Sequence, residues 1–379
     1  MSANNLSNLA NDARQWLFES AAPLWAERGR NEKGLFAESL MINGEPTDAP
    51  RRILVQTRQI FSYCEIGRLG WQGDWRTPTE AAINHLLASG RRDDGFYIHM
   101  FDLDGRVLEA EAFLYDHAFL LLALAHAGRA LKRHDLFAEA HRLTDLIEAK
   151  WRHPKGGFLN GDVDTSPRLQ NPHMHMLEAF SALHVCSGET RWKTLAEEMA
   201  ALSKKHFIDR ASGALLEYFT DDLLALPGLD GRLVEPGHCF EWTWLFERLA
   251  EENPEWVDIS DRLTGFARRF GIDASRGVAV NEILTDGATH NPTARLWPQT
   301  ERLKAALARR RRTNSPEESE EAARAYDGLK LYLATPTPGT WRDKLQSNGA
   351  WVDEPSPASS FYHITCALSE LISTVKSEN

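Results

Sequence analysis

An alternation of short and long links between predicted helices constrains the fold more than any other feature. Hydrophobic periodicity and capping signals predict twelve helices, and strand signals are confined to short pieces. The links after the second, fourth, sixth, eighth and tenth helices are short, whereas the others are long and rich in Gly, Pro, Asp and Asn. Short links join antiparallel helices into hairpins. The predicted helices are 5–28, 52–69, 77–91, 112–132, 134–151, 172–187, 189–206, 238–251, 255–272, 297–311, 316–334 and 358–375.

Six hairpins arranged alike place all the long loops on one face of the molecule. They can build an open solenoid or a closed ring. Closure gives an all-α (α/α)6 barrel with two concentric layers of six helices, which is the fold we predict. Strand signals within 95–109 and 213–222 predict short β-hairpins inside the loops. Nothing interrupts the rhythm, so we expect one domain over residues 1–379.

Composition and charge argue against several classes of protein. The net charge of −11 has the wrong sign for binding nucleic-acid phosphates. The most apolar run, 118–128, is too short to span a bilayer and contains His126. With a polar N-terminus, we expect a cytoplasmic protein whose partner is a small molecule, and a homodimer is compatible with the sequence. We expect buried free thiols at the four cysteines: Cys64, Cys186, Cys239 and Cys366.

Polar residues recur about every sixty residues, each time near the N-terminal end of an even-numbered helix. In a closed barrel these ends meet, so we expect the side chains to converge on one pocket roofed by the long loops. Histidine titrates near neutral pH, which suits such a pocket to proton transfer. The residues are Arg58, Tyr115, His117, Asn171, His173, His175, His238, Glu241, Arg295, Trp297, Glu301 and His363.

The pair His173 and His175 has a structural as well as a functional interpretation. Two positions apart on a helix, the rings point about 200° apart and do not chelate one ion. No H-E-x-x-H occurs, so we predict no metal site. We expect His173 to be structural and His175 to face the pocket. For Asn171, a role as helix N-cap is sufficient by itself.

The remaining charged groups on these helices have structural interpretations. Glu178 and Glu301 are expected as ion-pair partners on the inner wall. The run Arg309–Arg312 is expected to cap a helix C-terminus in solvent. The run Glu317–Glu321 is expected to form a solvated first turn.

Four motifs resemble the N-acylglucosamine 2-epimerase superfamily, in order and over nearly the whole chain. They are NPHMHMLEAF (171–180), EPGHCFEWTWLFERL (235–249), ARLWPQTERLKA (294–305) and SFYHI (360–364). The resemblance implies an (α/α)6 barrel that moves a proton at C2 of an open-chain sugar without a cofactor. Because the third motif reads RLWPQTE, it is most similar to the mannose isomerase and sulfoquinovose isomerase branch.

The resemblance also implies roles for particular residues. His238 and His363 match the general acid/base histidines, and Glu241 matches a carboxylate that could orient His238. Arg58 matches an arginine that holds and polarises substrate oxygens. The other candidate substrate-binding residues are Tyr115, Asn171, His175, Trp297 and Glu301.

We therefore expect an aldose–ketose isomerase that interconverts D-mannose and D-fructose, and also D-lyxose and D-xylulose, through a cis-enediolate. A sugar 2-epimerase and a sulfoquinovose isomerase remain open on the same scaffold. A glycoside hydrolase would need two carboxylates, such as Glu241 with Glu301 or Asp116. A helical-repeat binding protein would present a solvated concave surface instead. A phosphate or sulfonate would require cations, for which the candidates are Arg58, Arg168, Arg232 and Arg295.

Overall fold

The computed structural model describes residues 3–31, 33–163 and 166–376. Its helices follow the predicted alternation. Six helices come directly after the long loops: α3 (Ile53–Leu69), α5 (Leu114–Leu131), α7 (Gln170–Ser187), α9 (Pro236–Ala250), α11 (Leu296–Thr313) and α13 (Ser359–Lys376). The helices between them are α1 (Ala3–Gln15) with η1 (Trp16–Ala21) and α2 (Ala22–Glu27), α4 (Arg76–His85) with η2 (Leu86–Gly90), α6 (His134–Trp151), α8 (Thr190–Leu202) with η3 (Ser203–Phe207), η5 (Pro254–Trp256) with α10 (Val257–Phe270), and α12 (Pro316–Leu333).

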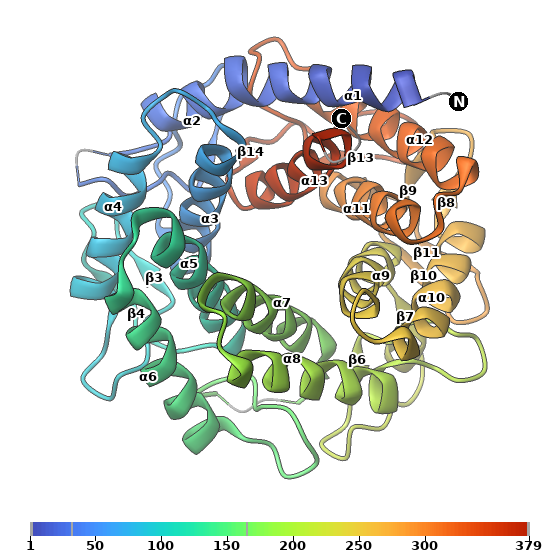
Figure 1. Cartoon of the computed structure of the whole chain (residues 1–379), viewed down its shortest axis with the longest axis horizontal. Coiled ribbons are helices and arrows are strands. Elements are labelled where there is room, and N and C mark those ends of the chain that lie inside the picture. The colour runs from blue at the N-terminus through green and yellow to red at the C-terminus, as the bar shows by residue number, and fades with distance from the viewer. Residues whose placement is uncertain (1–2, 32, 164–165, 377–379) are drawn as a thin grey trace.

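The two sets form concentric layers, which confirms the predicted (α/α)6 barrel (Figure 1). The helices after the long loops make the inner ring, and the others surround them. The ring is closed because α13 packs against α3, and α1 packs against α13 and α12. All inner helices run in the same direction, so their N-terminal ends lie together under the long loops. No helix of the described residues is long and apolar enough to cross a membrane.

Short strands tie each long loop to the next one around the ring. They are β1 (Ser39–Leu40), β2 (Arg51–Arg52), β3 (Met100–Phe101), β4 (Val107–Glu109), β5 (Arg168–Leu169), β6 (Tyr218–Phe219), β7 (Leu233–Val234), β8 (Ile272–Asp273), β9 (Val278–Ala279), β10 (Glu282–Leu284), β11 (Thr289–Asn291), β12 (Ala294–Arg295), β13 (Lys344–Leu345) and β14 (Ser356–Pro357). The antiparallel pairs β2–β3, β5–β6, β7–β10 and β12–β13 each join neighbouring loops, and β1–β14 joins the last loop to the first. A bridge between Phe113 and Gly161 completes the circuit.

The predicted hairpins are therefore only partly right. The 95–109 segment does form the β3–β4 hairpin. In the 213–222 segment, Phe219 does turn back to bridge Ala225, but β6 also pairs with β5 of the preceding loop, which was not predicted. The sequence pattern shows that a strand exists but not which loop it pairs with.

A recurring set of hydrogen bonds, made by the fourth residue of an inner helix, connects the loops to the inner helices. Gln56, the fourth residue of α3, accepts a hydrogen bond from the backbone N–H of Phe36 at 2.7 Å and donates one back to its carbonyl. At the fourth position of α7, His173 Nε2 accepts from the Phe158 N–H at 2.9 Å, and its Nδ1–H donates to the Leu169 carbonyl. His117 on α5 and Gln299 on α11 do the same at their positions. Because both nitrogens of its ring are engaged with backbone, His173 is structural, as predicted.

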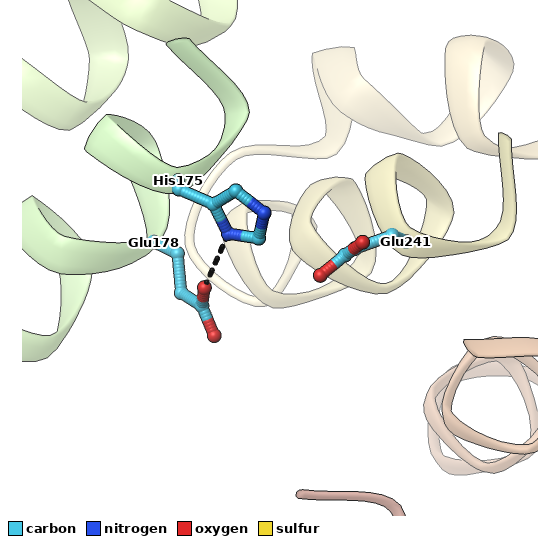
Figure 2. A group of neighbouring side chains, drawn as sticks. All are labelled: His175, Glu178 and Glu241. Atoms are coloured by element: carbon cyan, nitrogen blue, oxygen red, sulfur yellow. Dashed lines mark hydrogen bonds and ion pairs between the residues drawn. The ribbon is translucent and has the colours of Figure 1, made fainter. Parts of the chain in front are cut away.

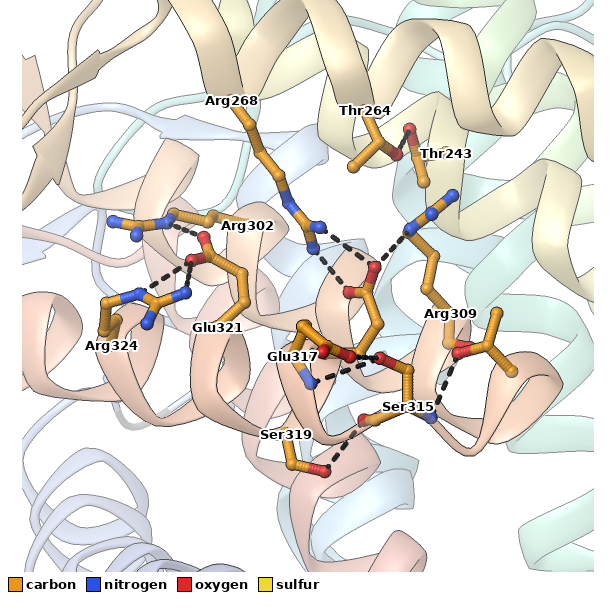
Figure 3. Close-up of polar contacts among 12 residues, drawn as sticks. Thr243, Thr264, Arg268, Arg302, Arg309, Ser315, Glu317, Ser319, Glu321 and Arg324 are labelled. Carbon is orange, nitrogen blue, oxygen red and sulfur yellow. Dashed lines mark hydrogen bonds and ion pairs between the residues drawn. The ribbon is translucent and has the colours of Figure 1, made fainter. Parts of the chain in front are cut away.

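Two predictions about exposed charge are right only in part. Arg311 and Arg312 are exposed in the last turn of α11, but Arg309 and Arg312 also bind Glu247 of α9 and Asp261 of α10. In the 317–321 turn, Glu317 is exposed, but Glu318 and Glu321 are buried. Glu318 holds Arg268 and Arg309, and Glu321 holds Arg302 and Arg324 (Figure 3). These networks fasten α12 to α10 and α11, so helix contacts override the expected solvation.

The cysteine prediction mostly agrees with the structure. All four are free thiols, and Cys64, Cys239 and Cys366 are buried. Cys186, near the end of α7, is half-buried.

Candidate active site

The predicted site residues gather in the N-terminal halves of the six inner helices, where they are nearly all buried. Arg58 comes from α3, Tyr115 from α5, Asn171 and His175 from α7, His238 and Glu241 from α9, Trp297 and Glu301 from α11, and His363 from α13. Only Tyr115 and Asn171 are half-buried. The helix N-termini add partial positive charge there, which favours oxyanions and neutral imidazoles.

The ring of His238 is held by Glu217, a residue that the sequence did not single out. His238 Nδ1 donates to Glu217 Oε2 at 2.9 Å. The same oxygen accepts from Gln170 Nε2 at 2.9 Å, and the Gln170 oxygen accepts from the Trp242 indole at 2.7 Å. Because this chain is buried, it fixes the orientation of the His238 ring, with Nδ1–H directed at Glu217.

Glu241 does not orient His238, contrary to what the resemblance implied. Its Oε1 makes no hydrogen bond and lies 3.9 Å from the ammonium of Lys304. The physical reason is helical geometry, since His238 turns toward the loop that carries Glu217, while Glu241 lies one turn deeper in the barrel.

His363 has a separate carboxylate partner. Its Nδ1 lies 2.8 Å from Glu301 Oε1, so an Nδ1–H donates there and Nε2 keeps its lone pair. Glu301 is fully buried, and its other oxygen lies 2.6 Å from Lys304. Glu301 was predicted to bind substrate; the structure places it behind His363 instead. Lys304 was missed because a helical lysine is usually solvent-exposed.

Trp297 lies between the two histidines. Its ring centroid is 4.9 Å from that of His238 and 5.7 Å from that of His363. The position depends on Gly237, where a Cβ would lie 2.5 Å from the Trp297 ring carbons. The local sequence Pro236-Gly237-His238 is thus explained: proline starts α9, glycine admits the indole, and the histidine follows.

Arg58 lies at one side of this group. Its guanidinium donates to the Ser359 carbonyl at 3.0 Å and to the Tyr115 hydroxyl at 2.9 Å, over the face of Phe119. Asn171 was proposed as an N-cap, but α7 begins one residue earlier, at Gln170, with Leu169 as its cap residue. The buried Oδ1 of Asn171 makes no hydrogen bond, which leaves it available to a ligand hydroxyl.

His175 does face the interior, as predicted, and is paired with Glu178. His175 Nδ1 lies 3.0 Å from Glu178 Oε2, and Glu178 also accepts a hydrogen bond from the Tyr362 hydroxyl. Glu241 on α9 points toward this pair from the other side (Figure 2). Glu178 is therefore an ion-pair partner on the inner wall, as the sequence suggested.

The environments of the histidines separate their pKa values widely. Burial disfavours the charged ring of His238, but the carboxylates of Glu217 and Glu235 outweigh burial and raise its pKa to about 10. Burial, together with the cations Arg58 and Lys304, holds the pKa of His363 well below its ordinary value. Burial likewise lowers the pKa of His175 to about 4. At neutral pH the site thus holds one imidazolium and two neutral imidazoles.

Among the residues that the structure describes, three groups of side chains bring ligand atoms close enough together for a metal ion: His175 with Glu178 and Glu241, Glu217 with Glu235 and His238, and Glu241 with Glu301 and His363. In each group a carboxylate is already engaged. Glu178 holds His175, Glu217 holds His238, and Glu301 holds both His363 and Lys304. The lysine ammonium takes the place beside Glu301 that a cation would need.

A cavity of about 350 Å³ lies at the opposite end of the barrel, among the C-terminal halves of the inner helices. Its wall includes Glu65, Arg129, Glu178 and Arg248. Glu178 therefore separates this cavity from the histidine cluster.

The chain is similar to known sugar isomerases and epimerases over most of its length. The sequence profile of the N-acylglucosamine 2-epimerase (GlcNAc 2-epimerase) family matches residues 34–367. A mannose-6-phosphate isomerase of Rhizobium meliloti (strain 1021) is 40% identical over 377 residues, covering 97% of each chain. A D-mannose isomerase of Thermobifida fusca is 26% identical over 306 residues, covering 71% of this chain and 73% of the other.

Solved structures show the same fold. A D-mannose isomerase superposes with a TM-score of 0.87 at 21% identity, covering 97% of each chain. A cellobiose 2-epimerase from Spirochaeta thermophila DSM 6192 gives 0.88 at 21% identity, covering 99% of this chain and 98% of the other. With the matched profile and the full-length relative, these findings identify the chain as a member of the N-acylglucosamine 2-epimerase family of sugar isomerases and epimerases.

Proposed function

We propose that the protein is an aldose–ketose isomerase that interconverts D-mannose and D-fructose. One observation carries the proposal: two histidines lie on either side of Trp297, one held neutral and the other held protonated. Titratable groups whose environments push their pKa values apart are the usual acid and base of an active site. The names of the isomerase relatives support the same reaction class.

In the proposed mechanism, the pyranose opens and Nε2 of neutral His363 removes the proton from C2. Glu301 stabilises the resulting imidazolium through Nδ1–H. The Arg58 guanidinium stabilises the negative charge that develops on the cis-enediolate oxygens. A proton passes from O2 to O1, and His363 then returns its own proton to C1, which gives the ketose. Neither step needs a cofactor, because the same nitrogen takes and returns the proton.

An unphosphorylated sugar is favoured by the partners of the arginines that could bind a phosphate. Arg168 Nε lies 3.1 Å from Asp221, and Arg232 lies 2.6 Å from Asp286. Arg295 Nε lies 3.7 Å from Asp343. Each of these three arginines already has a carboxylate neighbour that a phosphate would have to displace, and the fourth candidate, Arg58, donates to the Ser359 carbonyl and the Tyr115 hydroxyl.

Two alternatives keep specific support. The mannose-6-phosphate isomerase of Rhizobium meliloti favours a phosphorylated substrate by its name. The cellobiose 2-epimerase relatives, with protonated His238 as a second acid, favour return of the proton to C2. A glycoside hydrolase is disfavoured, because it needs two carboxylates that act as acid and base. Glu241 and Glu301 both lie beside the Lys304 ammonium instead.

The test is proton NMR of D-mannose, and separately of mannose 6-phosphate, with the purified protein in D2O containing EDTA. We expect fructose carrying deuterium at C1 from mannose and slower conversion of the phosphate ester. Glucose with deuterium at C2 would instead establish an epimerase. Faster turnover of mannose 6-phosphate would refute the assignment of the free sugar, and no change with either would refute both.

A pair of histidine variants tests the base. His363→Gln should lower the rate by at least about 100-fold, the low end of what a general base contributes. His134→Gln is the control, because His134 is exposed on α6, outside the cluster. Equal activities of the two variants would exclude His363 as the base.

A further inference from the structure

Lys304 is a completely buried lysine in the inner ring, and nothing assigned above to catalysis explains it. Its ammonium lies 2.6 Å from Glu301 Oε2, 3.9 Å from Glu241 Oε1 and 3.9 Å above the ring of Trp244. Burying a cation is costly unless it is paired. A single structural pair is often replaceable by apolar residues, so a lysine shared by two carboxylates next to His363 suggests a functional reason.

The reason lies in the charge balance around His363. The groups that face it are Arg58 from α3, His175 and Glu178 from α7, Glu241 from α9, and Glu301 and Lys304 from α11. Glu241 and Glu301 lie close together, with ligand atoms within 4.8 Å of each other and of His363. Two carboxylates at this separation do not both ionise without a cation.

We propose that Lys304 is a positioning residue that acts through Glu301: its ammonium keeps Glu301 a carboxylate, and the carboxylate holds His363 with the proton on Nδ1. The inference rests on the proposed role of His363 as base. Burial raises the pKa of Glu301, and Lys304 is the strongest influence that opposes the rise. Burial and the neighbouring Glu301 charge also raise the pKa of Glu241 well above its ordinary value.

Removing the ammonium has a defined consequence. In Lys304→Met, the Glu301–His363 pair gains one proton at neutral pH. If His363 takes it, the base is already protonated. If Glu301 takes it, its O–H donates to Nδ1, and Nε2 then carries the ring proton. Either way the Nε2 lone pair that removes the C2 proton is lost, and activity returns only when the pH is high enough to remove the extra proton.

The experiment follows His363 directly by NMR of protein labelled with ¹³C-histidine, with its signal assigned by comparison with His363→Gln. We expect the wild-type ring to stay neutral well below pH 6.5. In Lys304→Met, protonation of the pair should move upward by about 1–3 pH units, the usual effect of one charge within 4–6 Å. The acid limb of kcat/KM should move by the same amount. Lys304→Arg, which keeps the cation, should restore the wild-type limb even if kcat falls.

A second variant covers the case in which Lys304→Met does not fold. Lys304→Met with Glu301→Gln removes both charges together, and the amide oxygen still accepts from Nδ1. We expect this protein to fold and to keep the acid limb of the wild-type pH profile of kcat/KM. The proposal is overturned if Lys304→Met folds and His363 titrates as in the wild type, or if His363 in the double variant is protonated at neutral pH. Because the NMR readout needs no turnover, a wrong sugar assignment leaves this test intact.

Discussion

Gly237→Ala should disable the site although it adds only one methyl group to a helix. The added Cβ would lie 2.5 Å from two ring carbons of Trp297 and 3.1 Å from Pro298 Cβ. Carbon atoms in contact are about 3.5–4.0 Å apart, so the indole must retreat by about 1 Å. The indole lies between His238 and His363.

The magnitude follows from that displacement. Overpacking of this kind costs about 1–3 kcal/mol of stability. A displacement of about 1 Å among reacting groups costs about 100-fold in rate. We therefore expect kcat/KM for the sugar substrate to fall by about two orders of magnitude, and the tryptophan fluorescence spectrum to shift because the environment of Trp297 changes.

Gly265→Ala is the matched control. Gly265 is exposed in the middle of α10, and a Cβ there meets nothing within 4 Å. Because alanine is the better helix former, this variant should be about 0.5–1 kcal/mol more stable with unchanged kinetics. If the two alanine variants show the same kcat/KM and the same unfolding free energy, the packing argument is wrong.

Two further predictions concern buried carboxylates. The raised pKa of His238 gives stability that is complete below its unfolded pKa of about 6.5 and is lost as pH rises through about 10. Urea unfolding should therefore show the wild type weakening from pH 7 to 10, and Glu217→Gln should flatten that slope; an unchanged slope would exclude Glu217 as the cause. Glu321→Gln breaks the buried 2.6 Å pair with Arg302 and should cost about 3–5 kcal/mol, against at most about 1 kcal/mol for Glu320→Gln, whose side chain is 44% exposed. Similar losses in both variants would contradict the burial argument.

The fold could be predicted from the sequence because link length alone distinguishes inner from outer helices. A short link forces neighbouring helices to be antiparallel, and six repeats of that rule leave few arrangements. Ring closure needed more than this rule, since a solenoid obeys it too. The structure supplies the missing element in the strand pairs between loops, of which β1–β14 joins the last loop to the first.

Helix periodicity and the family resemblance together predicted which helices carry the residues of the site. Both histidines proposed as acid and base were predicted on inner helices and lie there. Glu217 was missed because it lies in a long loop, 21 positions before the histidine it holds. A usable signal does exist: Glu217 is the fourth residue after Gly213, and Glu38, His99 and Asp343 stand equally far from Gly34, Gly95 and Gly339, all glycines with positive φ.

Charge partners across helices were the least predictable part. Glu318 and Lys304 look solvated in sequence, because a charged residue on a helix normally faces water. Their partners come from other helices, and helix register decides which charges meet. No pattern within a single helix reports that register.

The circuit of loop-to-loop strands gives the molecule a closed topology in which the chain ends hold no special position. The first outer helix, α1, packs against α13 and α12 in the same way that other outer helices pack within the ring. Each hairpin can therefore exchange its loop for another without altering the order of its neighbours, provided that the short strands at the loop's edges are kept.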